Sequence, residues 1–214
     1  MARVKTTVTE GVAAYLARHS RQDDVLARVE RETAARPDGM MQVTPDEGAL
    51  LGMLARLVGA RNALEVGTFT GYSAICVARG LAEGGKLTCL ELDPDLAEIA
   101  QGNLDAAGVA DRVEIRVGPA NEALEEMPEE PTFDFVFLDA DKTGYPDYYD
   151  LIVPRLLPSG LLLLDNVLLR GAVVAPSDDR TRTMDELNRR VAEDERVDSA
   201  MTLVADGLTL VRKR

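Results

Sequence analysis

Apolar residues occur in short runs along the chain, and segments with the periodicity of helices separate these runs. From about residue 61 onward, strand-like and helix-like segments alternate. The strand-like runs are rich in leucine and β-branched residues and are apolar on both faces, which is typical of a parallel sheet covered by helices. The pattern predicts strands over 61–66, 86–92, 112–117, 133–138 and 160–164, and helices over 71–82, 94–107, 119–127, within 145–157 and within 171–194. The alternation predicts a doubly wound α/β fold.

The two ends of the chain depart from this alternation. Residues 8–34 have the pattern of helices, and residues 44–47 start another helix with an N-cap threonine, a proline and two early acids. Near the C-terminus, strand-like runs over 197–205 and 208–213 flank Asp206-Gly207, a dipeptide typical of tight hairpins. We therefore expect N-terminal helices and a C-terminal antiparallel hairpin added to the parallel sheet.

Composition is consistent with one globular domain. The chain has 214 residues, of which 46% are apolar, so it can bury a substantial core. We predict a single domain over 1–214, with an N-terminal helical cap over 1–60 and an α/β core over 61–214. The longest apolar runs have the length of strands, far below the roughly 20 residues of a membrane span. Residues 1–20 contain no continuous apolar segment of the signal-peptide type, which favours a cytoplasmic protein with no membrane partner.

Charge and rare residues narrow the possible chemistry. The net charge is −13, from 37 acidic and 24 basic residues, and no basic stripe is present, so nucleic acid is not an expected partner. The one histidine, His19, lies between basic residues near the N-terminus and is interpreted as a surface residue. Cys76 and Cys89 lie in apolar surroundings, as small core residues do. Acid–base or metal chemistry must therefore use carboxylates, amides and lysine.

A glycine-containing turn follows the first predicted strand. Glu65 ends this strand, and Gly67 and Gly71 follow with the spacing G-x-x-x-G. Open α/β sheets bind ligands at the carboxyl ends of their strands, where glycine allows close approach of the backbone. The turn alone is also compatible with a simple tight connection. The bare carboxylate of Glu65 needs a polar partner, and the positively charged amine of a methionine moiety would provide one.

An acid ends the second predicted strand. Glu91 occupies the position at which α/β nucleotide sites accept hydrogen bonds from ribose hydroxyls, whereas Asp93 is better explained as a helix cap. A nicotinamide enzyme would use the same acid, but the third glycine of its G-x-G-x-x-G turn is missing here. Ser73 either points its hydroxyl into the turn or belongs to the first turn of the helix.

A carboxylate–amide cluster is predicted from the fourth and fifth strands. Asp139 and Lys142 follow one apolar run, and Asp165 and Asn166 follow the next. Parallel pairing would bring these ends together at the edge of the sheet that carries the glycine turn. Asp139, Asp165 and Asn166 then offer hard oxygen ligands, which suit Mg²⁺. The alternative is that the two aspartates cap helices or pair with Lys142.

These segments together resemble the caffeoyl-CoA/catechol O-methyltransferase family. The resemblance runs from residue 41 to residue 171, in the family's order, through MQVTPDEG, LEVGTFTGYS, LELDPD, GPA, FDFVFLDADK and LLDNVLLRG. It implies a seven-stranded, mostly parallel, Rossmann-like sheet with one antiparallel strand. It also implies an enzyme that transfers the methyl group of S-adenosylmethionine to a hydroxyl of a small catechol-like substrate.

The resemblance further implies roles for individual residues. It implies that S-adenosylmethionine is bound by Val43, Glu65, Gly67, Thr68, Ser73, Glu91, Ala120 and Asp139. It implies that Mg²⁺ or another divalent cation is bound by Asp139, Asp165 and Asn166. Lys142 corresponds to the family's base or electrostatic partner of the phenolate, so Lys142 and Asp139 are the expected catalytic residues. The substrate-binding lysine of the plant enzymes has no clear equivalent, so binding of a CoA tail is not implied.

The same resemblance, with an amphipathic N-terminal helix, suggests a homodimer that acts on a small phenolic molecule. Two other classes of function remain as alternatives at this stage. One is a catalytically silent S-adenosylmethionine-binding subunit, and the other is a nicotinamide-dependent oxidoreductase. Intact Asp139, Lys142, Asp165 and Asn166 argue against the silent subunit.

Overall fold

The computed structural model describes residues 6–214 and contains one seven-stranded sheet in the order β3-β2-β1-β4-β5-β7-β6. The strands are β1 Asn62–Val66, β2 Lys86–Glu91, β3 Val113–Val117, β4 Phe133–Leu138, β5 Leu156–Leu164, β6 Val197–Thr202 and β7 Leu208–Lys213. The first five strands pair in parallel, and β7 runs antiparallel to both of its neighbours. The doubly wound, mostly parallel sheet with a C-terminal antiparallel hairpin is confirmed.

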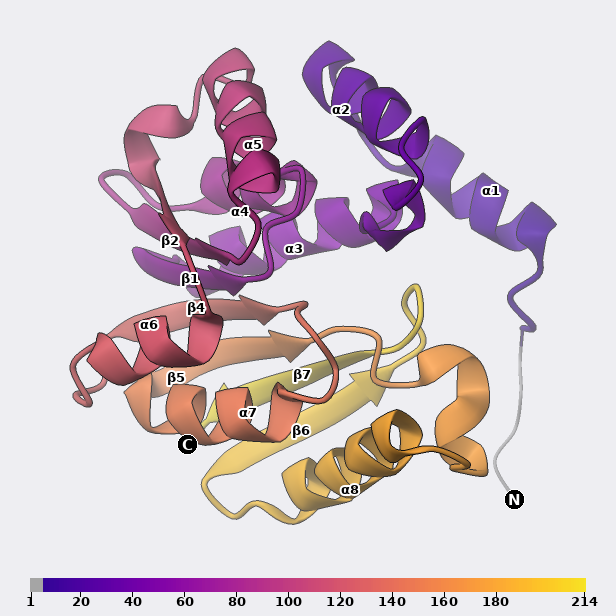
Figure 1. The fold of residues 1–214 in the computed structure, drawn as a ribbon, viewed down its shortest axis with the longest axis vertical. Helices are drawn as coiled ribbons and strands as arrows, with labels where there is room; N and C mark the ends of the chain where they lie inside the picture. Colours follow the sequence, from indigo (N-terminus) through magenta and orange to yellow (C-terminus); the bar gives the residue numbers. More distant parts are fainter. Residues whose placement is uncertain (1–5) are drawn as a thin grey trace.

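Helices cover both faces of the sheet (Figure 1). The helices are α1 Glu10–His19, α2 Asp24–Ala34, α3 Pro45–Val58, α4 Tyr72–Gly80, α5 Pro94–Ala106, α6 Ala120–Glu126, α7 Tyr145–Arg155 and α8 Asp179–Glu193, with short 3-10 turns at Gly39–Met41, Ala110–Arg112 and Leu169–Val174. Each of the strands β1 to β4 is therefore followed by a helix that returns across the sheet to the next parallel strand, as parallel connections require.

The alternation of side chains along each strand divides the core into two layers. Phe135 and Phe137 of β4 join a cluster with residues from α2, α3, α4 and α5. Their neighbours Val136 and Leu138 join the opposite cluster, with residues from α6, α7 and α8. Because successive strand side chains point to opposite faces, runs that are apolar throughout belong to a sheet that is buried on both sides.

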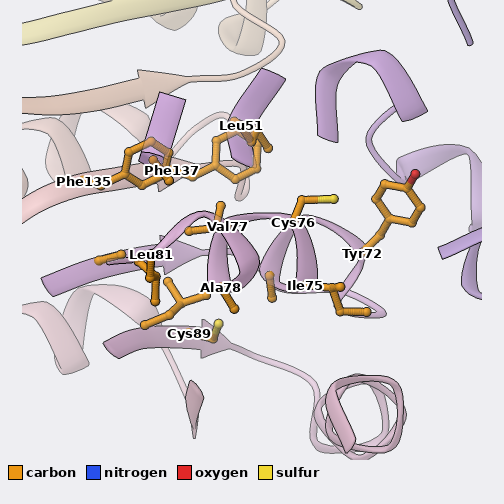
Figure 2. Packing of buried hydrophobic residues seen from close by; sticks show 14 of the residues in the cluster. Leu51, Tyr72, Ile75, Cys76, Val77, Ala78, Leu81, Cys89, Phe135 and Phe137 are labelled. Carbon is orange, nitrogen blue, oxygen red and sulfur yellow. The ribbon is translucent and has the colours of Figure 1, made fainter. Parts of the chain in front are cut away.

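The first layer is shown in Figure 2, where side chains of α4 lie among Leu51 of α3, Phe135 and Phe137 of β4 and Cys89 of β2. Ile75, Val77 and Ala78 of α4 have no exposed surface, and Leu51 of α3 is equally buried. Cys76 and Cys89 are free thiols within this cluster. The prediction that both cysteines are small core residues is confirmed.

The C-terminal hairpin has a longer loop than predicted. Thr202 pairs with Leu208, so the loop comprises residues 203–207, and the strand predicted over 197–205 ends at Thr202. Ala205 and Gly207 have φ values of +44° and +90°, so Asp206-Gly207 lies in a wider turn than the two-residue hairpin predicted. Because β7 begins beside the end of β5, this loop lies at the carboxyl edge of the parallel strands.

The predicted N-terminal helical region consists of separate helices. Helix α1 buries none of its residues, whereas α2 contributes Leu26 and Val29 to the first core layer. In Figure 1, α1 projects beyond the sheet and its covering helices. Within residues 6–214, no helix combines the length and the apolar character needed to cross a bilayer.

Candidate active site

The turn after β1 passes very close to the end of β4. Gly67 has φ +90°, and a Cβ atom built there would lie 2.0 Å from the carbonyl oxygen of Asp139. The backbone also ties the two segments together, because the N–H of Asp139 donates to the carbonyl of Val66 at 2.9 Å. Only glycine fits at position 67, and the predicted glycine turn and carboxylate cluster therefore lie side by side.

Glu91, at the end of β2, holds this turn in place. Its Oε2 accepts hydrogen bonds from the backbone N–H groups of Thr68 at 3.1 Å and Phe69 at 2.7 Å. Its Oε1 accepts one from the N–H of Asp93 at 3.0 Å. Phe69 is held at φ +52°, a left-handed conformation that a non-glycine residue keeps only when its surroundings enforce it. A carboxylate offers about four acceptor positions, so Glu91 retains capacity for one more donor.

Glu65 is the least satisfied polar group at this edge. The side chain has no exposed surface, and neither carboxyl oxygen has a hydrogen-bond partner among residues 6–214. Burial raises the pKa of the Glu65 carboxyl well above its usual range; the nearby Ser73 hydroxyl opposes this rise, and the charges of Asp139 and Glu91 add to it. A buried carboxyl without a donor is costly, so a cationic donor bound here would be strongly favoured.

Asp139, Lys142 and Tyr145 form a hydrogen-bonded chain after β4. Lys142 Nζ donates to Asp139 Oδ1 and to the hydroxyl oxygen of Tyr145, both at 2.7 Å. The Tyr145 O–H points at the carbonyl oxygens of Leu138 and Asp165, each 2.9 Å away. Lys142 is 8% exposed and Tyr145 is fully buried. The predicted pairing of Asp139 with Lys142 is thus present, and it leaves the second oxygen of Asp139 free for another ligand.

Asp165 and Asn166 lie at the end of β5, the strand next to β4. Asp165 is 1% exposed, and its Oδ1 accepts the backbone N–H of Asn166 at 2.6 Å. Burial raises the pKa of Asp165 well above its usual value, and the carboxyls of Asp139 and Glu47 raise it further. Asn166 has φ +55°, a conformation that asparagine tolerates better than most residues. The three predicted metal ligands therefore follow adjacent strands at one edge of the sheet.

Glu47, near the start of α3, joins these acids. It is 1% exposed, and burial raises the pKa of its carboxyl to about 7. The side chain of Asp165 lowers this pKa, whereas the charge of Asp139 raises it. Sequence reasoning treated this residue only as one of the early acids of a helix, because its pattern of T-x-x-E has that simpler explanation.

Negative groups outnumber positive groups at this edge. The acids are Glu47, Glu65, Glu91, Asp139 and Asp165, and within residues 6–214 Lys142 is the one cationic side chain bonded to any of them. No group of three or more histidine, cysteine or acidic side chains in the described part of the chain has metal-binding spacing. A cation would therefore rely on the Asn166 amide together with two carboxylates.

The remaining predicted cofactor residues lie next to the acids at this edge of the sheet or in the segment just before α3. Ser73 lies in the first turn of α4 and is 6% exposed, next to Glu65. Ala120 begins α6 just after Gly118, whose N–H donates to the carbonyl of Glu91 at 2.9 Å. Val43 is 7% exposed and belongs to the core cluster that also contains Tyr72. Ala120 is therefore near the predicted ribose acid, while Val43 lies directly before α3.

Two acids and two tyrosines near the site have structural roles. Asp93 caps α5 by accepting the N–H groups of Asp95 and Leu96, which confirms its predicted role. Asp141 starts the α7 region, where its Oδ2 accepts the N–H of Gly144 at 2.9 Å and its Oδ1 the hydroxyl of Tyr148 at 2.7 Å. Tyr149 donates to Asp194 at 2.9 Å, away from the cluster.

The doubly wound sheet, the glycine turn at its carboxyl edge and the acids beyond β2, β4 and β5 define the nucleotide-cofactor class of α/β enzymes. The O-methyltransferase family matches residues 17–214 of this chain. Curated relatives include caffeoyl-CoA O-methyltransferase 5 of Nicotiana tabacum, which is 35% identical over 207 residues, covering 91% of this chain and 86% of the relative.

Solved structures show the same relationship. An O-methyltransferase from Bacillus cereus in complex with SAH has a TM-score of 0.87 and 33% identity, with 95% of this chain and 97% of that chain covered. TomG, an O-methyltransferase of tomaymycin synthesis from Streptomyces achromogenes, was solved with SAM and has a TM-score of 0.84, 33% identity and coverage of 95% and 96%. The chain belongs to the O-methyltransferase family, which confirms the predicted family and class of enzyme and excludes the nicotinamide-dependent alternative.

Proposed function

We propose that this O-methyltransferase takes its methyl group from S-adenosylmethionine and transfers it, with the help of a divalent cation, to a hydroxyl of a small catechol-like acceptor. One observation carries the proposal: Glu47, Glu65, Glu91, Asp139 and Asp165 converge on one edge of the sheet with Lys142 as their cationic partner. Such an excess of buried negative charge is stabilised by cationic ligands. A sulfonium cofactor with an ammonium group and a divalent cation would supply that charge.

The proposed cofactor residues fit the parts of S-adenosylmethionine. Glu65, with two unpartnered oxygens, would accept hydrogen bonds from the ammonium group, and Ser73 beside it would add a hydroxyl. Glu91 would use its remaining capacity for a ribose hydroxyl, and Ala120 would lie against the adenine. Val43, Gly67, Thr68 and Asp139 complete the proposed cofactor set. The relatives from Bacillus cereus and Streptomyces achromogenes, solved with SAH and SAM, support this choice of cofactor.

The proposed cation ligands are Asp139, Asp165 and Asn166. Carboxylate and amide oxygens are the donors that Mg²⁺ prefers, and such sites keep positions for oxygens of the substrate. The second oxygen of Asp139 is not used by Lys142, and within residues 6–214 the Asn166 amide has no hydrogen-bond partner. A cation held there would lower the pKa of an acceptor hydroxyl and would fix two neighbouring oxygens of a catechol.

Lys142 and Asp139 are the proposed catalytic residues. The ammonium group of Lys142 lies 2.7 Å from Asp139, where it would stabilise the oxygen of the acceptor while the proton of that hydroxyl passes to solvent water. The acceptor oxygen then forms a bond to the methyl carbon while the bond between that carbon and sulfur breaks. Holding the two reactants in this alignment lowers the activation free energy of such reactions by about 7–11 kcal/mol in the best cases.

Methyl transfer to a panel of catechols and monophenols, with and without EDTA, tests the proposal. We expect catechols to be methylated, activity to be lost in EDTA and activity to return when Mg²⁺ is added. Asp139→Asn should remove most of the activity and should weaken SAH binding much less, because the other proposed cofactor residues are unchanged. The matched control is Asp134→Asn, at the opposite end of β4, where Asp134 accepts the N–H groups of Arg61 and Asn62. Full activity after complete removal of metal would contradict the cation-dependent mechanism.

We also propose that the enzyme is a homodimer. Helix α1 buries none of its residues, and Tyr15 and Leu16 are 56% and 43% exposed. Helix α3, which α1 contacts, exposes Met53 at 59% and Leu57 at 74%. Light scattering after size-exclusion chromatography should give twice the mass of the chain, and Leu16→Asp should shift the protein toward the monomer. A monomer at all concentrations of the unaltered protein would contradict the dimer.

A further inference from the structure

The turn after β1 is held from a second side by helix α5. A Cβ atom built at Gly71 would lie 3.2 Å from the Cβ atom of Ala100, so the backbone of the turn lies directly against this helix. Three residues further along α5, the side-chain amide of Asn103 donates a hydrogen bond to the carbonyl oxygen of Thr70 at 2.9 Å. Residues three apart lie on the same face of a helix, so Ala100 and Asn103 form one contact surface for the turn.

The burial of Asn103 is explained by its hydrogen bonds and not by the helix. Its side chain is 7% exposed, and asparagine is a poorer helix former than alanine or leucine. A buried amide costs free energy unless both of its ends are hydrogen-bonded. Here Nδ2 donates to Thr70 at 2.9 Å, and Oδ1 accepts an N–H of the Arg28 guanidinium at 3.1 Å. An aliphatic residue would fill the same space but would make neither bond.

Helix α2 reaches the same turn from the N-terminal part of the chain. It packs on the same face of the sheet as α4 and α5 (Figure 1). The hydroxyl oxygen of Thr33, at the end of α2, lies 2.9 Å from that of Thr70, and the two residues are 2% and 1% exposed. Arg28, which bonds to Asn103, belongs to the same helix. Thr70 is therefore the point at which α2, α5 and the turn meet.

The conformation of this turn needs support from outside. Phe69 has φ +52°, which a phenylalanine keeps only when its surroundings impose it. Glu91 holds the first half of the turn, because it accepts the N–H groups of Thr68 and Phe69. Asn103 holds the second half through the carbonyl of Thr70. The strained residue thus lies between two anchored segments.

We propose that Asn103 is a positioning residue for the cofactor: together with Thr33 of α2, it holds Thr70 and so fixes the turn after β1 in the conformation that binds S-adenosylmethionine. This inference rests on the function proposed above, in which Gly67 and Thr68 of this turn contact the cofactor. A turn that samples other conformations lowers the apparent affinity by the fraction of protein that stays competent to bind. Once the cofactor is bound the turn is back in place, so the transfer step keeps its rate.

Asn103→Asp removes the donor to Thr70 and keeps the acceptor for Arg28. Calorimetric titration with SAH should show an affinity about 10-fold weaker, equivalent to about 1.4 kcal/mol, as expected for one buried hydrogen bond. The KM for S-adenosylmethionine should rise by a similar factor, while kcat at saturation changes less than about twofold. The matched control is Asn188→Asp, because Asn188 of α8 donates its amide to the carbonyl of Val167 at 2.8 Å, in the loop after β5. SAH affinity should change less than about twofold in this control, since the two sites share no partner.

Hydrogen exchange separates positioning of the turn from a general loss of stability. In the SAH-free protein, the amides of residues 67–72 should exchange faster in Asn103→Asp than in the unaltered protein, whereas those of β4 should not. Saturation with SAH should restore most of the protection of residues 67–72. A residue that served only the packing of α5 would instead speed exchange throughout the core and leave the affinity for SAH unchanged.

Thr33→Val tests the same inference from α2 and decides it where Asn103→Asp does not fold. Valine keeps the shape of the side chain and removes the hydroxyl that lies beside Thr70. We expect Thr33→Val to weaken SAH binding about threefold, because one of the two supports of Thr70 remains. Unchanged affinity in this variant would overturn the inference that support of Thr70 positions the turn.

The outcomes separate this inference from the proposed function. If the unaltered enzyme binds no SAH, the proposed cofactor is wrong, and the role of Asn103 fails with it. If the unaltered enzyme binds SAH and Asn103→Asp binds it as tightly, only the role of Asn103 is overturned. Equal weakening by Asn103→Asp and Asn188→Asp would also overturn it, because the effect would then follow from a loss of stability and not from the turn.

Discussion

The hydroxyl oxygen of Tyr145 lies 2.7 Å from the ammonium nitrogen of Lys142, which in turn lies 2.7 Å from Oδ1 of Asp139. Tyr145 is fixed by the carbonyl oxygens that end β4 and begin the loop after β5, so it connects the two strands that carry the proposed cation ligands. Burial raises the pKa of Tyr145 well above its usual value, and Asp139 and Asp165 raise it further. The tyrosine therefore stays protonated and keeps Lys142 in one position.

We expect Tyr145→Phe to lower kcat about 10-fold. Lys142 would lose the hydroxyl oxygen to which it donates a hydrogen bond, and its ammonium group would no longer be held toward the substrate hydroxyl. The KM for S-adenosylmethionine should not change, and the free energy of unfolding should fall by about 1–2 kcal/mol as one buried hydroxyl is lost. Tyr149→Phe is the matched control, since it removes a hydroxyl of the same helix that bonds to Asp194 instead. Steady-state kinetics and urea denaturation of both variants measure these effects. Similar kcat values for the two variants would contradict the positioning role of Tyr145.

Gly67 provides a test of the close approach between the cofactor turn and β4. An alanine at this position would place its Cβ 2.0 Å from the Asp139 carbonyl oxygen, at φ +90°. We expect Gly67→Ala to lower the free energy of unfolding by about 2–5 kcal/mol, the sum of backbone strain and of a clash with a backbone atom that cannot yield.

Gly84→Ala is the control for Gly67, because Gly84 has φ +74° and nothing lies within 4 Å of the added Cβ. Gly84→Ala should lower the free energy of unfolding by about 1–2 kcal/mol, because only the left-handed backbone strain is added. Chemical denaturation of the two variants measures the difference. If both variants lose the same stability, the contact between the turn and β4 is not the constraint on position 67.

Much of the fold follows from the alternation of apolar runs and helical segments. The strand over 133–138 is predicted to the residue, because Phe133 to Leu138 is bounded by proline and threonine before it and by charged residues after it. Strand β5 begins at Leu156, four residues before the predicted start at 160, because a register shift lets Leu156 pair with Phe133 ahead of the Pro158-Ser159-Gly160 segment. Local sequence favours a turn in that segment, and only the neighbouring strand makes it part of the sheet.

The site is predictable where its residues follow strands directly. Asp139 and Asp165 stand out because each follows an apolar strand, and the parallel sheet brings such ends together. Glu47 could not be found in this way, because its relation to Asp165 depends on how α3 packs and not on the spacing within its own helix. The hydrogen bonds from the N–H groups of Thr68 and Phe69 to Glu91 are likewise tertiary, since they join the turn after β1 to the end of β2.

Asp194 gives a pH-dependent contribution to stability away from the site. Its side chain is 9% exposed and accepts hydrogen bonds from the guanidinium and backbone N–H of Arg196 and from the hydroxyl of Tyr149. The side-chain hydrogen bond from Arg196 holds the pKa of Asp194 well below its usual value, although partial burial opposes this shift. Because the pKa of Asp194 is lower in the folded state, its ionisation stabilises the fold. This stabilisation is fully present above the unfolded pKa of about 3.9 and is lost as the pH falls toward the pKa of the folded state.

We therefore expect Asp194→Asn to lower the free energy of unfolding by about 2 kcal/mol at pH 7. The difference between the two proteins should narrow steadily below about pH 4. Asp198→Asn is the comparison, because Asp198 pairs with the exposed Arg212 and Arg214, where solvent weakens the interaction. Urea denaturation from pH 3 to pH 7 measures both. A constant difference across this range would show that ionisation of Asp194 is not the source of its effect.

The loop after the proposed cation ligands is held in a strained conformation by the tip of the C-terminal hairpin. Leu169 and Arg170 have φ values of +46° and +54°, and such residues keep this conformation only when their surroundings impose it. Asp206 imposes it twice, because its carbonyl accepts the N–H of Leu168 at 3.0 Å and its Oδ1 accepts the N–H of Arg170 at 2.6 Å. The hairpin thus sets the position of a loop that begins at Asn166.

We expect Asp206→Ala to release this loop and to raise the KM for the acceptor several-fold, about 1 kcal/mol of binding. The affinity for SAH should stay the same, because most of the proposed cofactor residues lie in or after β1, β2 and β3, in the half of the sheet away from β7. Asp206→Asn is the matched control, since its amide oxygen can still accept the N–H of Arg170, and its KM should stay close to that of the unaltered enzyme. Kinetics with the best catechol of the panel, together with SAH titration, measure the two effects. An unchanged KM in Asp206→Ala would mean that the strained backbone of Leu169 and Arg170 is maintained by the loop itself and not by the hairpin.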